Sequence, residues 1–232
     1  MSALFVVSTP IGNMGDITKR AEKILSSVDI VFAEDTRVAQ KLFSGLGIKK
    51  RAISLNERSS DEKIKEVIVF LREGKTVAYV SDAGTPGICD PGGRLVEKAL
   101  NDIYGLEVIP VPGVSAVTAA LAVSGFPADS FVFLGFPPHK KRRAQFFSRL
   151  GSYSKELTVV LYESPHRIRK TLTEIKKNVS DKQDIMIGRE LTKKFESIYR
   201  MKAVEIKPFE FPEKGEYVLV IRSYAEIGRA HV

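Results

Sequence analysis

The stretch Ser-Asp-Ala-Gly-Thr-Pro-Gly-Ile-Cys-Asp-Pro-Gly-Gly at residues 81–93 directly follows the apolar run Thr-Val-Ala-Tyr-Val at residues 76–80. The run predicts a buried strand, and the four glycines and two prolines after it predict an irregular loop. In open α/β sheets, ligands bind beyond the carboxyl ends of strands, where glycine lets the main chain approach closely. The loop is therefore a candidate ligand site. The alternative is a plain connection in which Asp82 and Asp90 cap the following helix.

Length and composition predict one large α/β domain or two small ones. The 232 residues are 44% hydrophobic, and no apolar run approaches the roughly 20 residues needed to cross a bilayer. The chain starts with a strand pattern rather than a targeting segment, so we expect a cytoplasmic protein. Its single cysteine excludes an internal disulfide, and its three scattered histidines lack the spacing of metal ligands. We therefore expect no metal.

Strands and helices alternate through the first half of the chain. Apolar patterns predict strands at residues 4–8, 29–37, 52–55, 76–80 and 106–111, and helices at 18–26, 38–43, 61–72 and 94–103. This alternation is typical of a mostly parallel sheet. The next helix, residues 114–124, is almost uniformly apolar, so we expect it to be buried between two layers or two domains.

The second half of the chain predicts a mixed sheet, because its last strands have no helices between them. We expect strands at residues 131–135, 157–162, 185–189, 197–203 and 217–222, and helices near 140–150 and 165–178. The fold class is thus α/β, with an N-terminal domain at residues 1–112, a C-terminal domain at 113–225 and a tail at 226–232.

Three glycine- and proline-containing loops follow strands of the first half, at residues 9–16, 81–93 and 110–116. Parallel strands end at one edge of a sheet, so these loops should converge on one cleft. Their few charges are the acids Asp16, Asp82 and Asp90, which suit an uncharged or cationic ligand. Neither of the glycine-rich phosphate motifs of ATP and dinucleotide sites is present. A nucleoside with a positively charged sulfonium fits better than ATP or NAD.

Two strand ends of the second half mix acids and bases, as proton transfer beside an anionic substrate requires. They are Tyr-Glu-Ser-Pro-His-Arg at residues 162–167 and Gly-Arg-Glu-Leu-Thr-Lys-Lys-Phe-Glu at 188–196. Arg167 and Arg189 each have a nearby carboxylate, although structural ion pairs give the same pattern. His166 is either a base or a surface residue of a first helical turn.

A basic run occupies residues 139–143, with the sequence His-Lys-Lys-Arg-Arg. Together with a net charge of +8, it favours a polyanionic partner bound through phosphate contacts. Among these cations and those at the strand ends, Arg142, Arg143, Arg167 and Lys193 are the candidate phosphate contacts. The alternative for the run is the solvated start of a helix.

Six motifs occur in order along the chain: T-P-I-G-N at 9–13, A-E-D-T-R at 33–37, S-D-A-G-T-P-G-I-C-D-P-G at 81–92, P-G-V-S-A at 112–116, Y-E-S-P-H-R at 162–167 and R-E-L-T-K at 189–193. Together they resemble the tetrapyrrole methylase superfamily. Within it, the chain is similar to the branch that methylates the ribose 2′-hydroxyl of a cytidine in small-subunit (16S) ribosomal RNA.

The resemblance implies a homodimeric methyltransferase with two α/β domains of the class III type. S-adenosyl-L-methionine would bind in the cleft between the domains, and the partner would be small-subunit ribosomal RNA or the 30S particle. The implied cofactor-binding residues are Pro10, Gly12, Asp82, Ala83, Gly84, Ile88, Asp90, Pro112, Gly113, Ser115, Ala116, Tyr162, Glu163 and Ser164. Three positions depart from the usual pattern of the family: Leu55, Gly93 and Met201.

A ribose 2′-hydroxyl is a poor nucleophile at neutral pH, so its methylation needs alignment of the reactants and removal of a proton. The candidate proton acceptors are Glu163, Glu190, Glu196 and Lys193. Glu163 is favoured as the base or the base-orienting group, because it lies where the second domain should face the sulfonium. The predicted catalytic residues are Glu163, Lys193, Glu196, Arg167 and Arg189.

Two other functions compete with this one. A tetrapyrrole (precorrin-type) C-methyltransferase is disfavoured by the Y-E-S-P-H-R and R-E-L-T-K motifs and by the basic run. A non-enzymatic RNA-binding factor on the same fold is disfavoured by the intact cofactor loops.

Overall fold

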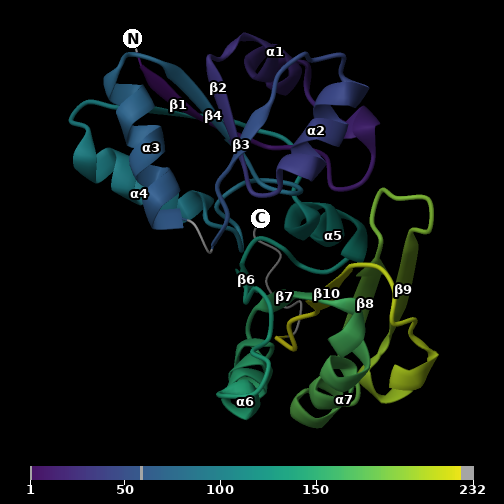
Figure 1. The fold of residues 1–232 in the computed structure, drawn as a ribbon. Helices are drawn as coiled ribbons and strands as arrows, with labels where there is room; N and C mark the ends of the chain where they lie inside the picture. The colour runs from purple at the N-terminus through teal and green to yellow at the C-terminus, as the bar shows by residue number, and fades with distance from the viewer. Residues whose placement is uncertain (1, 58–59, 226–232) are drawn as a thin grey trace, which may run out of the picture. The chain divides into compact units, whose positions relative to one another are not determined.

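The chain divides into two compact units, Met1–Ser115 and Ala116–Val232. The computed structural model describes residues 2–57 and 60–225 and is drawn as a ribbon in Figure 1. The predicted tail at 226–232 lies outside the described residues. None of the helices in the described part of the chain is long and apolar enough to cross a membrane.

The first unit contains a five-stranded sheet in which every pairing is parallel, as the alternation of elements predicts. Its strands are β1 (Ala3–Val7), β2 (Ile30–Ala33), β3 (Ala52–Ser54), β4 (Thr76–Val80) and β5 (Glu107–Val111). They lie in the order β3-β2-β4-β1-β5, so β3 and β5 are the edge strands. All five carboxyl ends therefore lie at the same edge.

Four helices cover the two faces of this sheet (Figure 1). They are α1 (Lys19–Ser27), α2 (Thr36–Gly45), α3 (Ser60–Arg72) and α4 (Gly92–Asp102). Along β2, Val31 and Ala33 pack with α1 and α2, whereas Phe32 between them packs with α3 and α4. Because successive side chains of a strand point to opposite faces, both faces are buried and the strands are almost entirely apolar.

Two predicted boundaries in the first unit are wrong for a shared reason. The strand predicted at 29–37 ends at Ala33, because Asp35 accepts a hydrogen bond from Arg37 N (2.8 Å) and caps α2. The helix predicted from residue 94 begins at Gly92, whose amide donates to Asp90 Oδ1 (2.7 Å). In both places an aspartate accepts a main-chain hydrogen bond and starts the helix earlier than the apolar periodicity indicates.

The second unit contains a mixed five-stranded sheet, which confirms the predicted fold class. Its strands, in the spatial order β6-β7-β10-β8-β9, are β6 (Phe131–Phe133), β7 (Thr158–Glu163), β8 (Asp184–Arg189), β9 (Ser197–Lys202) and β10 (Tyr217–Ile221). Only β6 and β7 pair in parallel. The helices α6 (Arg143–Tyr153) and α7 (Ile168–Asn178) share a core with β7, β8 and β10.

One face of the apolar helix α5 (Ala116–Ser124) is buried within the second unit, and its burial between two layers or two domains stays a prediction. Its buried residues are Val117, Ala120, Leu121 and Ser124, and the helix contacts β10. Their spacing places them on one face of the helix. Val123, on the remaining surface of the helix, is 41% exposed. Exposed apolar side chains of this kind are ordinary at protein surfaces.

Candidate functional site

The three predicted loops meet at the carboxyl edge of the parallel sheet in the first unit. Thr9 and Gly84 exchange two main-chain hydrogen bonds, at 2.9 and 3.0 Å. Ser8 Oγ donates to Thr85 Oγ1 (3.1 Å), which in turn donates to Val114 O (3.1 Å). The loops that follow β1, β4 and β5 are thus joined by direct contacts, as the parallel topology predicts.

A side chain is disfavoured at two glycines of this junction. Gly84 has φ +75°, and a Cβ there would lie 3.3 Å from Ile11 Cγ2 and 3.5 Å from Val114 O. A Cβ at Gly113 would lie 2.8 Å from Ser8 Cβ. Glycine is therefore favoured at Gly84 chiefly by its backbone conformation and at Gly113 by the close approach of Ser8.

Two carboxylates, the partly buried Glu34 and the exposed Asp82, lie beside these loops. Asp82 Oδ1 accepts from Asp35 N (2.9 Å), and Asp82 N donates to Glu34 Oε2 (3.3 Å). Burial raises the pKa of Glu34 and of Asp82, and neighbouring negative charges raise both further. A bound cation would stabilise their ionised forms. Glu34 is not among the site residues predicted from the sequence, although the A-E-D-T-R motif at the end of β2 contains it.

Asp90, in contrast, is occupied within its own loop. Its carboxylate accepts from Gly87 N (2.9 and 2.8 Å), Ile88 N (3.1 Å) and Gly92 N (2.7 Å). These contacts support the alternative interpretation of Asp90, in which it shapes the connection and starts α4. Its predicted contact with a ligand stays a prediction. Ile88 presents a side chain that is 45% exposed.

In the second unit, Glu163 is the last residue of β7 and its side chain is fully buried. Its Oε1 accepts from Ser164 N (2.7 Å) and from Arg167 Nη2 (2.7 Å). Its Oε2 accepts from Thr171 Oγ1 (2.5 Å). Both carboxylate oxygens are therefore engaged by donors of the turn at Pro165–Arg167 and of α7, which gives Glu163 the contacts of an orienting residue.

Two shielded arginines extend this network to the loop before α6. Arg167 Nη1 donates to Pro137 O (2.7 Å), and Arg143 Nη1 donates to Pro138 O (2.9 Å). Arg143 also donates to Thr171 Oγ1 (2.6 Å) and to Glu174 Oε2 (2.7 Å). Arg143 is 4% exposed, so the prediction that it contacts phosphate is wrong. Arg143, the first residue of α6, is thus buried, whereas the preceding cations Lys140, Lys141 and Arg142 are exposed.

The turn between β8 and β9 has an unusual backbone. Glu190 and Thr192 have φ +53° and +66°, in a region that residues other than glycine rarely adopt. Thr192 N donates to Glu196 Oε2 (2.5 Å), and Glu216 N donates to Glu190 Oε1 (2.9 Å). Arg189 Nε donates to Lys214 O (2.8 Å). These contacts hold the predicted catalytic residues Arg189 and Glu196 in one short turn.

Lys193 in this turn is the centre of an ion-pair cluster. Its Nζ lies 2.9 Å from Glu190 Oε1 and 2.8 Å from Glu216 Oε2. Desolvation opposes the charged form, but the hydrogen bonds to Glu216 and Glu190 outweigh it and raise the pKa of Lys193. Lys193 therefore carries its proton at neutral pH, so its ground state is a cation and not a base.

Tyr162, next to Glu163 in β7, packs against two aromatic side chains of the second unit. Tyr162 packs edge-on against Phe133, with ring centroids 4.9 Å apart, and its ring lies 5.5 Å from that of Phe136.

Of the three positions that depart from the family pattern, Leu55 is fully buried in the core of the first unit. Met201 packs against the core of the second unit, and Gly93 lies exposed in the first turn of α4. Within the described ranges, no group of His, Cys, Asp or Glu is arranged to hold a metal ion.

A parallel sheet with glycine-containing loops at its carboxyl edge, followed by a mixed α/β unit, is an arrangement found in known enzymes. The crystal structure of diphthine synthase matches with a TM-score of 0.73 over 96% of this chain and 90% of that one. At 14% identity, this likeness shows the fold alone. The fold class is that of two-unit α/β proteins with one parallel and one mixed sheet.

Residues 3–207 match the family described as Tetrapyrrole (Corrin/Porphyrin) Methylases, and the chain belongs to this family. It is a methyltransferase of the kind that uses S-adenosyl-L-methionine as methyl donor. A Thermotoga maritima protein named ribosomal RNA small subunit methyltransferase I is 45% identical over 95% of this chain and 98% of its own length. A Vibrio cholerae protein of the same name is 40% identical over 97% of this chain and 78% of its own length.

The loops of the first unit fit such a cofactor in two respects. Thr9 Oγ1 and Asp16 Oδ2 are buried without a hydrogen-bond partner among the described residues, so two polar atoms of the first loop can still accept or donate. Asp82 and Glu34 supply negative charge for a cation, and no Lys or Arg belongs to the loops at 9–16, 81–93 or 110–116. These oxygen atoms and carboxylates therefore suit a positively charged nucleoside.

Proposed function

We propose that this protein transfers a methyl group from S-adenosyl-L-methionine to the 2′-hydroxyl of a cytidine ribose in small-subunit ribosomal RNA. The observation that carries the proposal is the 45% identity, over nearly the whole of both chains, with a ribosomal RNA small subunit methyltransferase I. The choice of ribose oxygen and of cytidine rests on the six sequence motifs. The proposed substrate would place the protein in the cytoplasm, acting on free RNA or on the 30S particle.

The proposed cofactor site begins with the joined loops of the first unit. Pro10, Gly12, Ala83, Gly84, Pro112, Gly113 and Ser115 would offer main-chain groups, and Asp82 with Glu34 would offer negative charge. Ile88 and Asp90 would border the site, and the further residues predicted for it, Ala116, Tyr162, Glu163 and Ser164, belong to the second unit. The close packing of the loops at Gly84 supports this assignment, because a side chain there would press on Ile11 and Val114 and disturb the loops that would form the site.

When bound, the cofactor supplies an electrophilic methyl group on a positively charged sulfur. The protein's task is then to align the attacking oxygen with that group and to accept its proton, and alignment supplies most of the rate. Arg167 and Arg189 are proposed to set the geometry at the two strand ends. Each is anchored by a main-chain carbonyl, Arg167 by Pro137 O and Arg189 by Lys214 O.

For the proton, we propose that Glu163 acts as the orienting group of the site and that Glu196 is the candidate acceptor. Glu163 has three donors on its two oxygens, so a direct role as base would require one of these contacts to open. Glu196 is exposed, and its carboxylate accepts a hydrogen bond from Thr192 N. Lys193, held as a cation, would contribute positive charge beside an anionic substrate.

A homodimer remains part of the proposal. Sedimentation of the purified protein should give about twice the mass of the 25.7 kDa chain. A monomer at concentrations that support full activity would remove this part of the proposal without affecting the chemistry.

The test is methyl transfer from labelled cofactor to small-subunit particles and to naked ribosomal RNA, with the modified nucleotide mapped. We expect label on one cytidine, at the ribose oxygen. Calorimetry with the cofactor alone serves as the control, because a non-enzymatic RNA-binding factor would bind no cofactor. Transfer to a tetrapyrrole, or no transfer to RNA by a protein that binds the cofactor, would refute the proposed substrate.

A further inference from the structure

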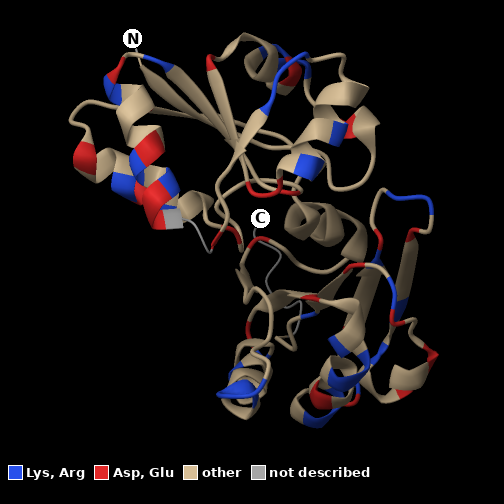
Figure 2. Cartoon of the chain, in the orientation of Figure 1, with Lys and Arg blue, Asp and Glu red and all other residues tan. Residues whose placement is uncertain are grey.

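A stretch of the first unit from residue 36 to residue 56 contains five Lys and Arg and no Asp or Glu. It comprises α2, the connection after it and β3, which is an edge strand of the sheet. Figure 2 shows Lys and Arg on α2 and on the segment that leads into β3. The loops at 9–16, 81–93 and 110–116 differ from this segment, because they contain acids and no Lys or Arg.

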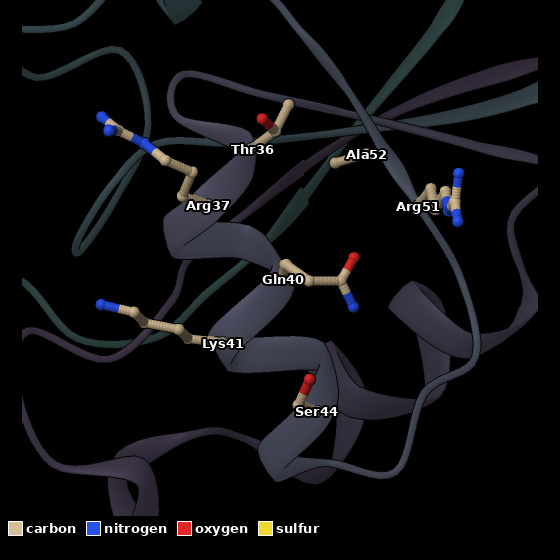
Figure 3. Close-up of a pocket in the computed structure, with 7 residues that line it drawn as sticks. All are labelled: Thr36, Arg37, Gln40, Lys41, Ser44, Arg51 and Ala52. Carbon is tan, nitrogen blue, oxygen red and sulfur yellow. The ribbon is translucent and has the colours of Figure 1, made fainter.

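The polar side of α2 lines an open hollow of about 700 Å³ (Figure 3). Arg37 and Lys41 lie four residues apart, and so do Gln40 and Ser44, so all four side chains share one side of the helix. The opposite side packs into the core through Leu42 and Phe43. The hollow is therefore formed by the solvent side of an amphipathic helix.

A second hollow of about 530 Å³ adjoins the first and shares Gln40 and Arg51 with it. Its other lining residues are Lys49 and Lys50. Lys50 is anchored, because its Nζ donates to Ser26 O (3.2 Å) and to Val28 O at the end of α1. This anchor fixes the segment that carries Lys49 and Arg51.

Three of these cations are available to a partner. Lys41, Lys49 and Arg51 are exposed, and among the described residues no carboxylate forms an ion pair with any of them. Arg37 is partly neutralised, since its guanidinium lies 2.6 Å from Asp35 Oδ2. The neutral side chains between the cations, Gln40 and Ser44, can donate hydrogen bonds to phosphate oxygens.

We infer that this surface, made by Arg37, Gln40, Lys41, Ser44, Lys49 and Arg51, binds the phosphodiester backbone of the RNA substrate. Of the residues described, none that lines either hollow has an aromatic side chain on which a base could stack, so the surface should position RNA without reading its sequence. One end of it borders the cofactor loops through Arg37 and Asp35, whose amide donates to Asp82. The backbone would thus be held along α2 on its way to the methyl-transfer site.

This inference rests on the proposed RNA substrate, and its test separates the two. The variant Lys41→Gln, Lys49→Gln, Arg51→Gln is compared with Lys19→Gln, Arg20→Gln, Lys23→Gln, which removes the same charges from exposed positions of α1 in the same unit. For each protein, the dissociation constant for a small-subunit RNA fragment is measured over a series of salt concentrations. Methylation kinetics, cofactor affinity and circular dichroism are measured alongside.

We expect the first variant to bind RNA more weakly and to lose roughly one unit of salt slope per lost phosphate contact. Its KM for RNA should rise at least tenfold more than that of the α1 variant, with kcat and cofactor affinity unchanged. A salt slope and KM equal to those of the α1 variant would overturn the inference. So would unchanged binding to naked RNA with weakened binding to particles, which would indicate a protein partner. Failure of the parental protein to methylate RNA would instead overturn the proposed function.

Discussion

Arg167 and Glu163 form a shielded ion pair at the end of β7, with 2.7 Å between Nη2 and Oε1. The Glu163 side chain is fully buried and that of Arg167 is 16% exposed. Arg167 also holds Pro137 O and Ser164 Oγ, so the pair joins the strand end to the loop that carries the exposed cations Lys140 to Arg142. A change at Glu163 should therefore disturb the geometry of both segments.

We expect Glu163→Gln to lower kcat for methylation by roughly a hundredfold while both ligands still bind. It should also lower the free energy of unfolding by about 3 kcal/mol, because Arg167 loses its buried partner. Urea unfolding and a pH–rate profile separate the two possible roles. If Glu163 orients the site, the pH–rate profile of the variant should keep the parental shape. If Glu163 is the base, the profile of the variant should lose its acidic limb. Parental turnover across the whole pH range would show that Glu163 has neither role.

Gly84 provides a test of the cofactor loops with a matched control. Gly84→Val should abolish cofactor binding, because the new side chain enters the junction beside Ile11 and Val114. Gly105 has nearly the same backbone conformation, φ +73°, but a Cβ added there would meet no atom within 4 Å. Gly105→Val should thus suffer similar backbone strain, of about 1 to 3 kcal/mol, and bind the cofactor normally. Calorimetry on both folded variants gives the answer, and normal binding by Gly84→Val would exclude the site.

The fold follows from the sequence wherever an element is defined by its own residues. The run at residues 76–80 is buried on both faces, so its apolar character alone gives the bounds of β4. The burial of Arg143 could not be predicted, because it depends on Thr171 and Glu174, which α7 brings close from about thirty residues away. The contact between Glu34 and Asp82, beside the proposed cofactor loops, could not be predicted either. These residues follow different strands and meet only because β2 and β4 are neighbours.

The raised pKa values of Asp82 and Glu34 predict that cofactor affinity depends on pH. A cation binds the ionised carboxylates best, so affinity should fall as the pH is lowered through their raised pKa values. Asp82→Asn should weaken binding at neutral pH and flatten this dependence. The control is Asp102→Asn, an exposed position at the end of α4. Equal pH profiles for parental protein and Asp82→Asn would show that Asp82 does not face the sulfonium.

The raised pKa of Asp82 also affects the stability of the protein without cofactor. A carboxyl whose pKa is higher in the folded state than in the unfolded state costs stability as the pH rises through the interval between the two values. Asp82 should therefore contribute a loss of stability between acidic and neutral pH. Asp82→Asn should remove this contribution, so the stability of the variant relative to the parental protein should rise with pH. Thermal unfolding at both pH values measures the difference, which added cofactor should reduce because it binds the ionised folded form.

The basic segment before α6 contains two kinds of cation that the sequence does not distinguish. Lys140, Lys141 and Arg142 are exposed, whereas Arg143 is buried and donates to three groups. If the exposed cations contact RNA, Lys140→Gln, Lys141→Gln, Arg142→Gln should raise the dissociation constant for RNA and lower its salt slope by roughly one unit per lost contact.

Arg143→Gln should lower the stability of the protein and leave its RNA binding unchanged. Removing a guanidinium that pairs with Glu174 should lower the free energy of unfolding by about 3 kcal/mol, because the remaining partners lose their donor. Its RNA salt slope, measured where the variant is folded, should equal the parental one, since Arg143 has no exposed charge to release counterions from phosphate. Salt-dependent binding and urea unfolding of the two variants therefore form a crossed experiment. A lowered salt slope for Arg143→Gln, or unchanged RNA binding by the triple variant, would contradict this division of roles.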